Sequence, residues 1–344
     1  MFIDAPEISA ISAPDLASYD RILLAFSGGK DSLAALLKTL RDLSALGVSM
    51  SKVEIHHHDV DGDGAVFMDW VVTRAYCEAV AAHFGLPIYF SHKVGGFKRE
   101  MYRENTPTAP IRFEVPLADG GKEWCEVGGD GPLNTRLKFP QVSADLSVRW
   151  CSGYLKIDVM ARLITNQDRF NNSRTLVITG ERAQESTARA KYQTFEPHRT
   201  DKRSGRLARH VDHWRPIHDW SEEQVWEIIR ENGIVPHVAY QLGWGRLSCI
   251  TCIFGSADQW ATIKAVFPDR FEAIANPEES FGVTIRRGET VRQLADKGTP
   301  YAAALERPDL VALANSDVWT QPIWVPTEEW QEPAGAYGEN AGPL

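Results

Sequence analysis

Residues 21–32 read Arg-Ile-Leu-Leu-Ala-Phe-Ser-Gly-Gly-Lys-Asp-Ser, and this stretch decides the fold. The apolar run at 21–26 is typical of a strand that is buried on both faces of a parallel sheet. After the loop, apolar side chains recur at helical spacing, namely Leu33, Leu36, Leu37, Leu40 and Leu43. The loop at 27–32 is therefore predicted to join a strand to a helix.

The same alternation of strand and helix patterns continues along the chain. Strands are predicted at residues 53–60, 87–92 and 176–180, and helices at residues 66–84, 152–167 and 221–232. The last helix has a capping-box start, with Ser221 as the N-cap and Gln224 at the third helical position. We therefore expect an α/β fold, a doubly wound and mostly parallel sheet with helices on both faces.

Two segments depart from this alternation. Residues 94–147 are rich in glycine, proline and charge, and we expect a long insertion or lid that lies outside the sheet. Beyond Ser248 the pattern becomes helical and irregular, and a proline- and glycine-rich tail at 322–344 is expected to be loosely held. The predicted organisation is an α/β domain at 1–245, including the insertion, and a smaller helical C-terminal region at 246–344.

The composition is that of an ordinary globular protein with a sizeable core, because 43% of the 344 residues are hydrophobic and 24% are charged. No run approaches the roughly 18 apolar residues of a membrane helix. The first residues carry Asp4 and Glu7 and no basic region, so we expect a cytoplasmic protein without a secretory signal. Five cysteines are too few for a disulfide scaffold.

The loop at 27–32 has the residue types of a phosphate-binding loop. Gly28 and Gly29 let successive N–H groups point at phosphate oxygens, and the following helix N-terminus adds partial positive charge. Lys30 can neutralise a phosphate, and Asp31 can hold Mg²⁺. The flanking hydroxyl groups that can donate to phosphate are those of Ser27 and Ser32. The motif is neither G-x-x-x-x-G-K-[ST] nor G-x-G-x-x-G, and an ordinary tight turn is the alternative.

A local basic strip contrasts with the net charge of −9. Its members between Arg182 and Arg215 are Arg189, Lys191, Arg199, Lys202, Arg203, Arg206 and Arg209. The acids that oppose them are Glu185, Glu196, Asp201 and Asp212. The strip suggests a polyanionic ligand, and a solvated loop is the alternative.

Three segments together resemble a known family. Residues 27–32 match the PP-loop of the ATP pyrophosphatase (adenine nucleotide α-hydrolase) superfamily. Residues 179–189, Thr-Gly-Glu-Arg-Ala-Gln-Glu-Ser-Thr-Ala-Arg, and residues 214–226, Trp-Arg-Pro-Ile-His-Asp-Trp-Ser-Glu-Glu-Gln-Val-Trp, resemble its phosphoadenosine phosphosulfate (PAPS) reductase branch. The likeness spans about residues 20–270 and implies a doubly wound α/β nucleotide-binding domain.

The resemblance implies roles for individual residues. Lys30, Asp31 and Arg182 are the implied catalytic residues, acting on ATP with Mg²⁺. The implied nucleotide-binding residues are Ser27, Gly28, Gly29, Lys30, Asp31, Ser32, Asp61, Gly180, Glu185, Ser186 and Arg189. Asp59 is an alternative to Asp61 as the acceptor of a ribose hydroxyl. For Arg182 and Arg189, surface ion pairing is the alternative, although ligands of open α/β sheets bind where these residues lie, after the carboxyl end of a strand.

Three cysteines are candidate metal ligands. Cys249 and Cys252 form a C-x-x-C pair, which is a metal or redox signal. Cys151 directly precedes the helix expected from Ser152, where a helix N-terminus lowers the pKa of a thiol. Zinc with a histidine such as His237 as a further ligand, or no metal, is the alternative to the cluster that the resemblance implies.

In the family, cysteines at equivalent places hold a [4Fe–4S] cluster, and some members use an adjacent Cys-Cys pair. Here Trp150 precedes Cys151, so three cysteines would leave one iron open to a sulfide or a substrate. Cys77 and Cys125 are interpreted as plain thiols. The histidines at 56–58 alternate between the two faces of a strand, so they are not expected to form a metal site.

The resemblance also narrows the reaction. PAPS reductases use a nucleophilic cysteine near the C-terminus, and this chain has none after Cys252. The remaining branch cleaves the α–β bond of ATP, adenylates an oxygen and lets sulfur displace AMP. Within that branch the chain is similar to DNA phosphorothioation proteins of the DndC or SspD kind.

The implied partners are ATP, a DNA substrate, a cysteine desulfurase and other modification-complex proteins, and no membrane is expected. The DNA would approach along the strip between Arg182 and Arg215. Two alternatives stay open: a nucleotide-sulfate reductase, and a non-catalytic partner that binds nucleotide or DNA.

Overall fold

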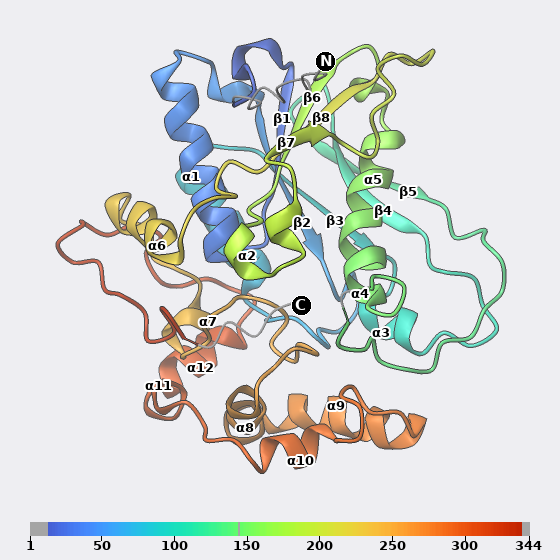
Figure 1. Cartoon of the computed structure of the whole chain (residues 1–344), viewed down its shortest axis with the longest axis vertical. Helices are drawn as coiled ribbons and strands as arrows, with labels where there is room; N and C mark the ends of the chain where they lie inside the picture. Colours follow the sequence, from blue (N-terminus) through green and yellow to red (C-terminus); the bar gives the residue numbers. More distant parts are fainter. Residues whose placement is uncertain (1–12, 144, 339–344) are drawn as a thin grey trace, which may run out of the picture.

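The computed structural model describes residues 13–143 and 145–338. These residues form an eight-stranded sheet with the order β5-β4-β3-β2-β1-β6-β8-β7 (Figure 1). Its strands are β1 (Arg21–Ala25), β2 (Val53–Asp59), β3 (Ile88–Lys93), β4 (Ile111–Pro116), β5 (Lys122–Val127), β6 (Arg174–Ile178), β7 (Phe195–Pro197) and β8 (His210–Trp214). The central pairings are parallel, and the pairings at both edges are antiparallel. The predicted fold class is confirmed.

Helices cover both faces of the sheet. The helices are α1 (Lys30–Ala45), α2 (Thr73–His83), α3 (Gly96–Met101), α4 (Trp150–Ser152), α5 (Asp158–Thr165), α6 (Glu222–Glu231), α7 (Val238–Gln241), α8 (Ala257–Val266), α9 (Pro268–Phe281), α10 (Val291–Ala295), α11 (Ala302–Glu306) and α12 (Pro308–Ala314). Ile22 and Leu24 of β1 belong to the core beneath α1, α2 and α6, whereas Leu23 packs in the core beneath α5. The apolar run of β1 is therefore buried on both faces, because successive side chains point to opposite sides.

The segment at 94–147 is partly inside the sheet, so the prediction of a separate insertion was wrong. It contains α3 and the hairpin of β4 and β5, which extends the sheet beyond β3. Ile111 and Phe113 pack in the core beneath α5. The sequence signal was weak because β5 is an edge strand whose side chains are largely exposed, so they show no buried face.

Two predicted helix boundaries were wrong. The helix expected from residue 66 begins at Thr73, and the segment before it is a loop held by the Asp61 carboxylate. The helix expected from Ser152 begins at Trp150 and passes through a π-helical stretch at Gly153–Ile157 before α5. Cys151 therefore lies inside the first turn and not before it.

The start of α6 is confirmed. Ser221 Oγ accepts a hydrogen bond from the Gln224 N–H at 3.3 Å, and Gln224 Oε1 accepts one from the Ser221 N–H at 2.9 Å. This reciprocal cap satisfies two of the N–H groups that a helix leaves without an internal partner.

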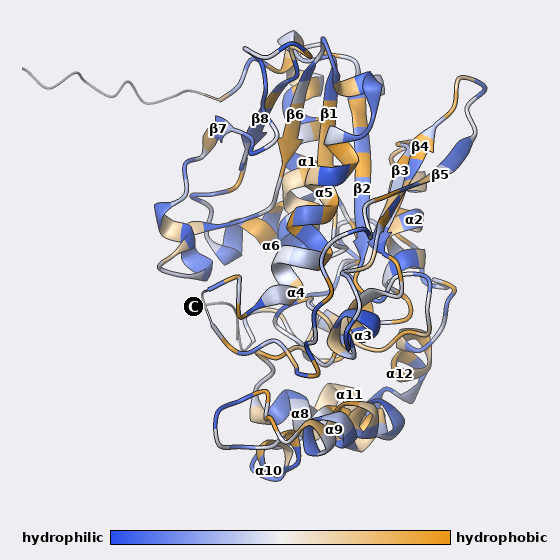
Figure 2. Ribbon diagram, turned by 90° about the vertical axis from the view of Figure 1, so that its right-hand side faces the viewer, coloured by the Kyte–Doolittle hydropathy of each residue, from blue (hydrophilic) through white to orange (hydrophobic). Residues whose placement is uncertain are grey.

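Helices α8 to α12 lie beyond one end of the sheet, as both ribbon views show (Figures 1 and 2). They share a hydrophobic core with residues 60–72, α3 and Trp150. This core joins residues on both sides of the predicted boundary at residue 245, and the boundary itself stays a prediction.

The tail from residue 322 is held against the protein through residue 338, contrary to the expected loose tail. Trp330 Nε1 donates to the Ile234 carbonyl at 2.8 Å, and the Gly335 N–H donates to the Tyr240 carbonyl at 2.7 Å. Residues 1–12 and 339–344, on which the expectations about the two ends also rest, lie outside the described residues. Within the described ranges, no helix is long and apolar enough to cross a membrane.

Glu54 of β2 is a buried charge that links the sheet to the loop before β6. Arg169 Nη1 donates to its two oxygens at 2.6 and 2.7 Å, and His56 Nε2 lies 3.3 Å from Oε2. Burial by itself would raise the pKa of Glu54, but these hydrogen bonds and the Arg169 charge lower it to about 2. Burial also lowers the pKa of His56, so Arg169 supplies the counter-charge at neutral pH.

We expect Glu54→Gln to lower the free energy of unfolding at pH 7 by roughly 1–3 kcal/mol, because the folded state binds the charged carboxylate more strongly than the unfolded state does. The difference should shrink as the pH falls below about 4.3, the ordinary value for glutamate, and should vanish near the folded-state pKa of about 2. Urea unfolding of both proteins between pH 7 and pH 3 measures this. A difference that stays constant with pH would show that the charge of Glu54 is not the cause.

Candidate active site

The loop at 27–32 lies at the carboxyl end of β1, where the order of the strands reverses. From β1 the chain extends the sheet through β2 and β3 on one side, and later through β6 and β8 on the other. In open α/β sheets, ligands bind outside the carboxyl ends of the strands at such a switch point. The topology therefore predicts a ligand site at the loops that follow β1 and β6.

These two loops touch through their backbones at Gly180. A Cβ atom placed on Gly180 would lie 2.4 Å from the Asp31 carbonyl oxygen and 2.7 Å from the Ser32 nitrogen. Only a glycine permits this approach. Gly28 has a φ of +79°, and a Cβ there would meet the Cys77 sulfur at 3.3 Å. The predicted residues of the two loops are therefore brought together as one surface.

A buried group of charges lies at the start of α1. Arg182 Nε donates to Asp31 Oδ1 at 2.6 Å. Lys30 Nζ lies 3.6 Å from Asp31 Oδ2 and 3.2 Å from Glu222 Oε1, and it donates to the Gly245 carbonyl at 3.1 Å. The side chains of Lys30 and Arg182 are only 2% and 3% exposed. Arg182 is thus no surface ion pair, and Lys30 is balanced by carboxylates from two elements.

The charges in this group stabilise one another. Burial would raise the pKa of Asp31, but the charges of Lys30 and Arg182 hold it below its usual value. Burial would lower the pKa of Lys30, but Asp31 and Glu222 raise it. Both side chains are therefore ionised at neutral pH.

The loop after β6 is organised around Glu185. Its Oε2 accepts from the Arg182 N–H at 2.9 Å, and the carboxylate pairs with Arg189. Ser186 Oγ accepts from the Arg189 N–H at 3.2 Å. Ser27 and Ser32 are in mutual contact, with 3.2 Å between their hydroxyl oxygens. All the predicted residues of both loops therefore lie around the carboxyl ends of β1 and β6.

Sequence reasoning missed Arg149 and Arg246. Arg246 Nη2 lies 3.9 Å from Glu185 Oε1, and its charge also acts on Asp31. Burial and the charges of Arg189 and Arg246 lower the pKa of Arg149. Its Nε and Nη1 atoms are buried and have no hydrogen-bond partner among the described residues. No motif marks these arginines, and only the fold places them beside the loops.

Tyr240 and Glu222 were also missed. The Tyr240 hydroxyl accepts from the N–H groups of Lys30 at 2.8 Å and Leu247 at 3.1 Å. It thereby ties the first residue of α1 to the segment after α7. Glu222 is the first residue of α6, and the visible capping box there indicated a helix start but not an ion pair with Lys30.

The structure gives Asp61 a different role from the one implied by the resemblance. Its carboxylate accepts from the N–H groups of Phe67, Met68 and Asp69 at 2.8–3.0 Å and holds the loop before α2. Oδ2 takes part in three of these bonds and Oδ1 in one, and the ribose role that the resemblance implies stays a prediction. Asp59, the alternative, pairs with Arg74 Nη1 at 3.1 Å.

The three histidines of β2 have separate partners. His56 contacts Glu54, His58 Nδ1 contacts Ser91 Oγ at 2.6 Å, and His57 Nδ1 lies 2.8 Å from the Phe26 carbonyl oxygen. Cys77, which is fully buried, lies beside the same His57 nitrogen at 3.4 Å. The contact of His57 with the Phe26 carbonyl supports the end of β1.

Cys151, Cys249 and Cys252 all pack against the hydrophobic core of the C-terminal helices. Burial raises the pKa of Cys151 to about 11 and that of Cys249 well above its usual value. The expected lowering at the helix start was wrong for Cys151, because burial outweighs it. Among the described residues, no three His, Cys, Asp or Glu side chains are arranged to hold a metal ion. As placed, the cysteines do not form a ligand set, and His237 instead accepts from the Ala239 N–H.

The basic strip between Arg182 and Arg215 is not continuous, contrary to its interpretation as one surface. Arg215 is buried and pairs with Glu181 and Glu196. Arg203 pairs with Asp201 and Asp212. The fold separates the remaining cations between the two ends of the sheet.

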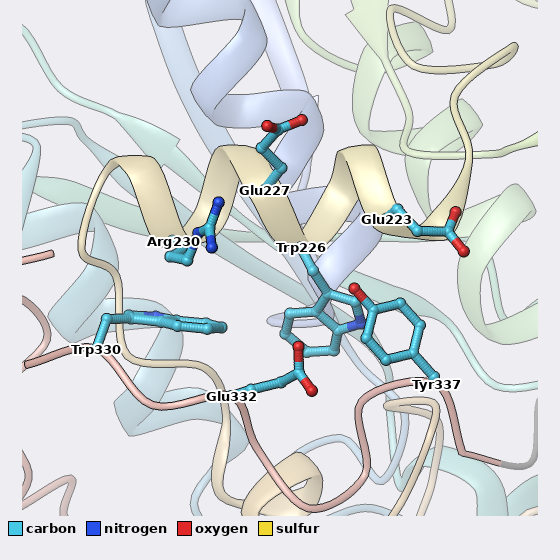
Figure 3. Close-up of a pocket in the computed structure, with 7 residues that line it drawn as sticks. All are labelled: Glu223, Trp226, Glu227, Arg230, Trp330, Glu332 and Tyr337. Carbon is cyan, nitrogen blue, oxygen red and sulfur yellow. The ribbon is translucent and has the colours of Figure 1, made fainter. Parts of the chain in front are cut away.

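A cavity of about 240 Å³ lies on the outer side of α6 (Figure 3). It is lined by Glu223, Trp226, Glu227, Arg230, Trp330, Glu332 and Tyr337. Three carboxylates and one cation make this cavity repulsive to a triphosphate. This cavity therefore does not suit the nucleotide that the sequence predicts.

Comparison with known families supports part of this description. Residues 136–254 match the phosphoadenosine phosphosulfate reductase domain, which makes this segment PAPS reductase-like. The match includes the loop after β6 and the C-x-x-C pair, and it does not include the loop at 27–32.

Two curated relatives are uncharacterized proteins. One, of 37.8 kDa from Escherichia phage 186, is 32% identical over 151 residues, which is 44% of this chain and 42% of that protein. The other, from Methanocaldococcus jannaschii, is 25% identical over 134 residues, 39% of this chain and 30% of that protein. The chain thus spans less than half the length of the relatives it matches.

Among solved structures, Candida glabrata FMN adenylyltransferase in complex with FAD and inorganic pyrophosphate matches with a TM-score of 0.36 and 9% identity. The match covers 68% of this chain and 55% of that one. The complex of the same enzyme with ATP gives a TM-score of 0.36 and 11% identity, over 71% and 55%. Likeness at this level says nothing about the reaction.

We expect Gly180→Ala to abolish nucleotide binding and to lower the free energy of unfolding by roughly 1–3 kcal/mol, because the new methyl group would strike the backbone of α1. Isothermal titration with ATP and urea unfolding measure the two effects. Gly131→Ala is the matched control, since a Cβ at Gly131 meets nothing within 4 Å. Equal behaviour of the two variants would contradict the close contact between the loops.

Proposed function

We propose that the chain binds ATP at the loop of residues 27–32 and transfers its adenylyl group to an acceptor oxygen. The observation that carries this proposal is Arg149, a half-buried residue whose Nε and Nη1 atoms are buried without a hydrogen-bond partner among the described residues, next to Arg189 and Arg246. A buried guanidinium is costly without an anion. A triphosphate held at the switch point would supply that anion.

The charge balance at the loops supports this assignment. Lys30 and Arg182 are matched by Asp31 and Glu222, and Glu185 lies between Arg189 and Arg246. Arg149 adds a cation that no carboxylate within 4.0 Å opposes in the described residues. The site therefore has a surplus of positive charge where phosphates would bind, although the whole chain is acidic.

In the proposed reaction, an acceptor oxygen attacks the α-phosphorus of ATP. The bond between the α-phosphorus and the bridging oxygen breaks, and pyrophosphate leaves with the electron pair. Phosphoryl chemistry of this kind depends on positioning and on stabilisation of developing charge. Lys30 and Arg182, which are buried and held in place by Asp31, are suited to the charge on the leaving phosphates.

Asp31 is also the residue suited to hold Mg²⁺, because its carboxylate is ionised and magnesium prefers oxygen ligands. When bound, the ion would neutralise phosphate charge. Arg182 and Lys30 already face the two oxygens of Asp31, so the carboxylate would have to be shared with them.

The finer proposal concerns the acceptor. By resemblance to DNA phosphorothioation proteins, the acceptor would be a phosphate oxygen of DNA. A sulfur nucleophile would then attack the DNA phosphorus, the bond from this phosphorus to the adenylated oxygen would break, and AMP would leave with that oxygen. A cysteine desulfurase would be the sulfur source. The match of residues 136–254 also keeps a PAPS reductase as the second candidate. No iron–sulfur step is included, since the cysteines as placed form no ligand set.

We expect the purified protein to release pyrophosphate from ATP and to attach the adenylyl group to duplex DNA supplied as the acceptor, and EDTA to stop the reaction. Asp31→Asn should reduce the rate by at least about 100-fold, because the neutral amide no longer holds the ion or balances Arg182. Chromatography of labelled ATP identifies the products.

Lys38→Ala is the matched control, because Lys38 lies on α1 but pairs only with Asp42 among the described residues. Release of ADP and phosphate would reject adenylyl transfer. Release of sulfite from PAPS would select the reductase. ATP binding without turnover of any nucleotide would select the non-catalytic partner.

The cysteines allow a separate prediction. If the family's cluster forms here, protein purified without oxygen will contain about three to four irons, and serine at Cys151, Cys249 or Cys252 will each remove them. Cys125→Ser, on the edge strand β5, is the control and should retain the iron. Iron and zinc analysis decides the outcome, and a protein without either metal would leave these three as buried thiols.

A further inference from the structure

A second cavity, which unlike the first is lined by cations, lies at the other end of the sheet. It has a volume of about 280 Å³, and its polar lining is Arg162, Thr165, Arg199, Thr200, Lys202 and Arg209. Arg209 directly precedes β8, and Thr165 ends α5 before β6 begins. The cavity therefore faces the amino ends of these parallel strands, whereas the loop at 27–32 is at the carboxyl end of β1.

Arg209 is the strongest feature of this cavity. It is only 6% exposed, and its guanidinium donates to the Thr200 carbonyl at 3.0 Å and to Asn171 Oδ1 at 3.4 Å. No carboxylate of the described residues lies within 4.0 Å of it. Both of its partners are neutral, so the charge of Arg209 is buried without compensation, which is costly unless an anion joins it.

The other three cations of the cavity are exposed to solvent and also have no ion-pair partner among the described residues. Arg162, Arg199 and Lys202 form no ion pair within the described parts of the chain, and the lining contains no carboxylate. The nearby acids are already engaged, since Asp201 and Asp212 both pair with Arg203. Four positive side chains thus share one small cavity.

Three of these cations lie on the loop at 199–209, whose backbone is held by several hydrogen bonds. The Lys202 N–H donates to the Arg209 carbonyl at 2.8 Å, and Asp201 Oδ1 accepts from the Val211 N–H at 2.8 Å. His198 Nδ1 contacts Thr200 Oγ1 at 2.8 Å. Burial together with the charges of Arg199 and Arg215 lowers the pKa of His198 to about 4, so it is neutral near pH 7. The cavity is preorganised, which reduces the cost of binding.

One feature opposes an anion, because the carbonyl end of α5 carries partial negative charge. The carbonyl of Ala161 accepts from Thr165 Oγ1 at 2.9 Å, and that of Arg162 accepts from the Asn166 N–H at 3.1 Å. These oxygens are therefore engaged within the helix end. Four full charges outweigh the remaining partial charge.

We infer that this cavity binds a phosphate group, a site separate from the nucleotide loops and independent of the proposed reaction. Guanidinium groups match phosphate oxygens in geometry, and the threonine hydroxyls add polar contacts. Inorganic phosphate and the backbone of a nucleic acid share this chemistry. Since the two sites are at opposite ends of the sheet, both can be occupied at once.

The test compares Arg199→Ala/Lys202→Ala with Lys264→Ala/Arg287→Ala, a control of equal charge change in the C-terminal region. Each protein is titrated with inorganic phosphate by calorimetry and with a short duplex DNA by fluorescence anisotropy at several salt concentrations. The cavity variant should bind inorganic phosphate, the duplex DNA or both at least about tenfold more weakly than the control. For DNA, the negative slope of log K against log salt concentration should also become shallower by about two.

If the cavity variant loses affinity for inorganic phosphate alone, the ligand is free phosphate. If it loses affinity for DNA and its binding depends less steeply on salt, the ligand is a nucleic-acid backbone. Equal binding of both ligands by the cavity variant and the control overturns the inference. Arg209→Met gives a second readout that does not depend on the surface residues. Addition of the ligand that the titrations identify, inorganic phosphate or the duplex DNA, should raise the melting temperature of the wild-type protein but not that of Arg209→Met. An equal rise in both proteins would overturn the inference.

Discussion

The ion pair between Asp31 and Arg182, at 2.6 Å, joins the two halves of the sheet at the point where the strand order reverses. Asp31 lies in the first turn of α1 after β1, and Arg182 follows β6, so the pair binds the two central loops to each other. The backbone contact at Gly180 makes the same connection without side chains. Charge and steric fit therefore position a single surface, and Lys30 and Glu222 complete its inner side.

Burying these charges is tolerable because each has an opposite partner. Isolated buried ions are strongly destabilising, whereas paired ions offset much of the desolvation cost. Arg149 and Arg209 stand apart from this pattern, since no carboxylate of the described residues lies within 4.0 Å of either. We propose that these two groups are sites of anion binding, one beside the loops after β1 and β6 and the other at the far end of the sheet.

Tyr240 of α7 connects the tail to the loop at 27–32. Its hydroxyl accepts from Lys30 at the start of α1, and its carbonyl accepts from Gly335 in the tail. The tail, α7 and the loop at 27–32 are thereby linked by backbone and hydroxyl groups whose spacing no sequence pattern shows. This explains why the tail, although rich in proline and glycine, lies against the protein as far as residue 338.

The sequence by itself determined what local patterns encode: the strand, loop and helix of residues 21–45, the cap at Ser221 and the parallel α/β class, because periodicity and capping act over a few residues. It also identified Lys30, Asp31, Gly180 and Arg182 as candidates. Only the tertiary structure decided that residues 111–127 extend the sheet, that Asp61 holds a loop, and that Arg149 and Arg246 join the site. These outcomes depend on pairing and burial between segments far apart in the chain, so no local pattern contains them.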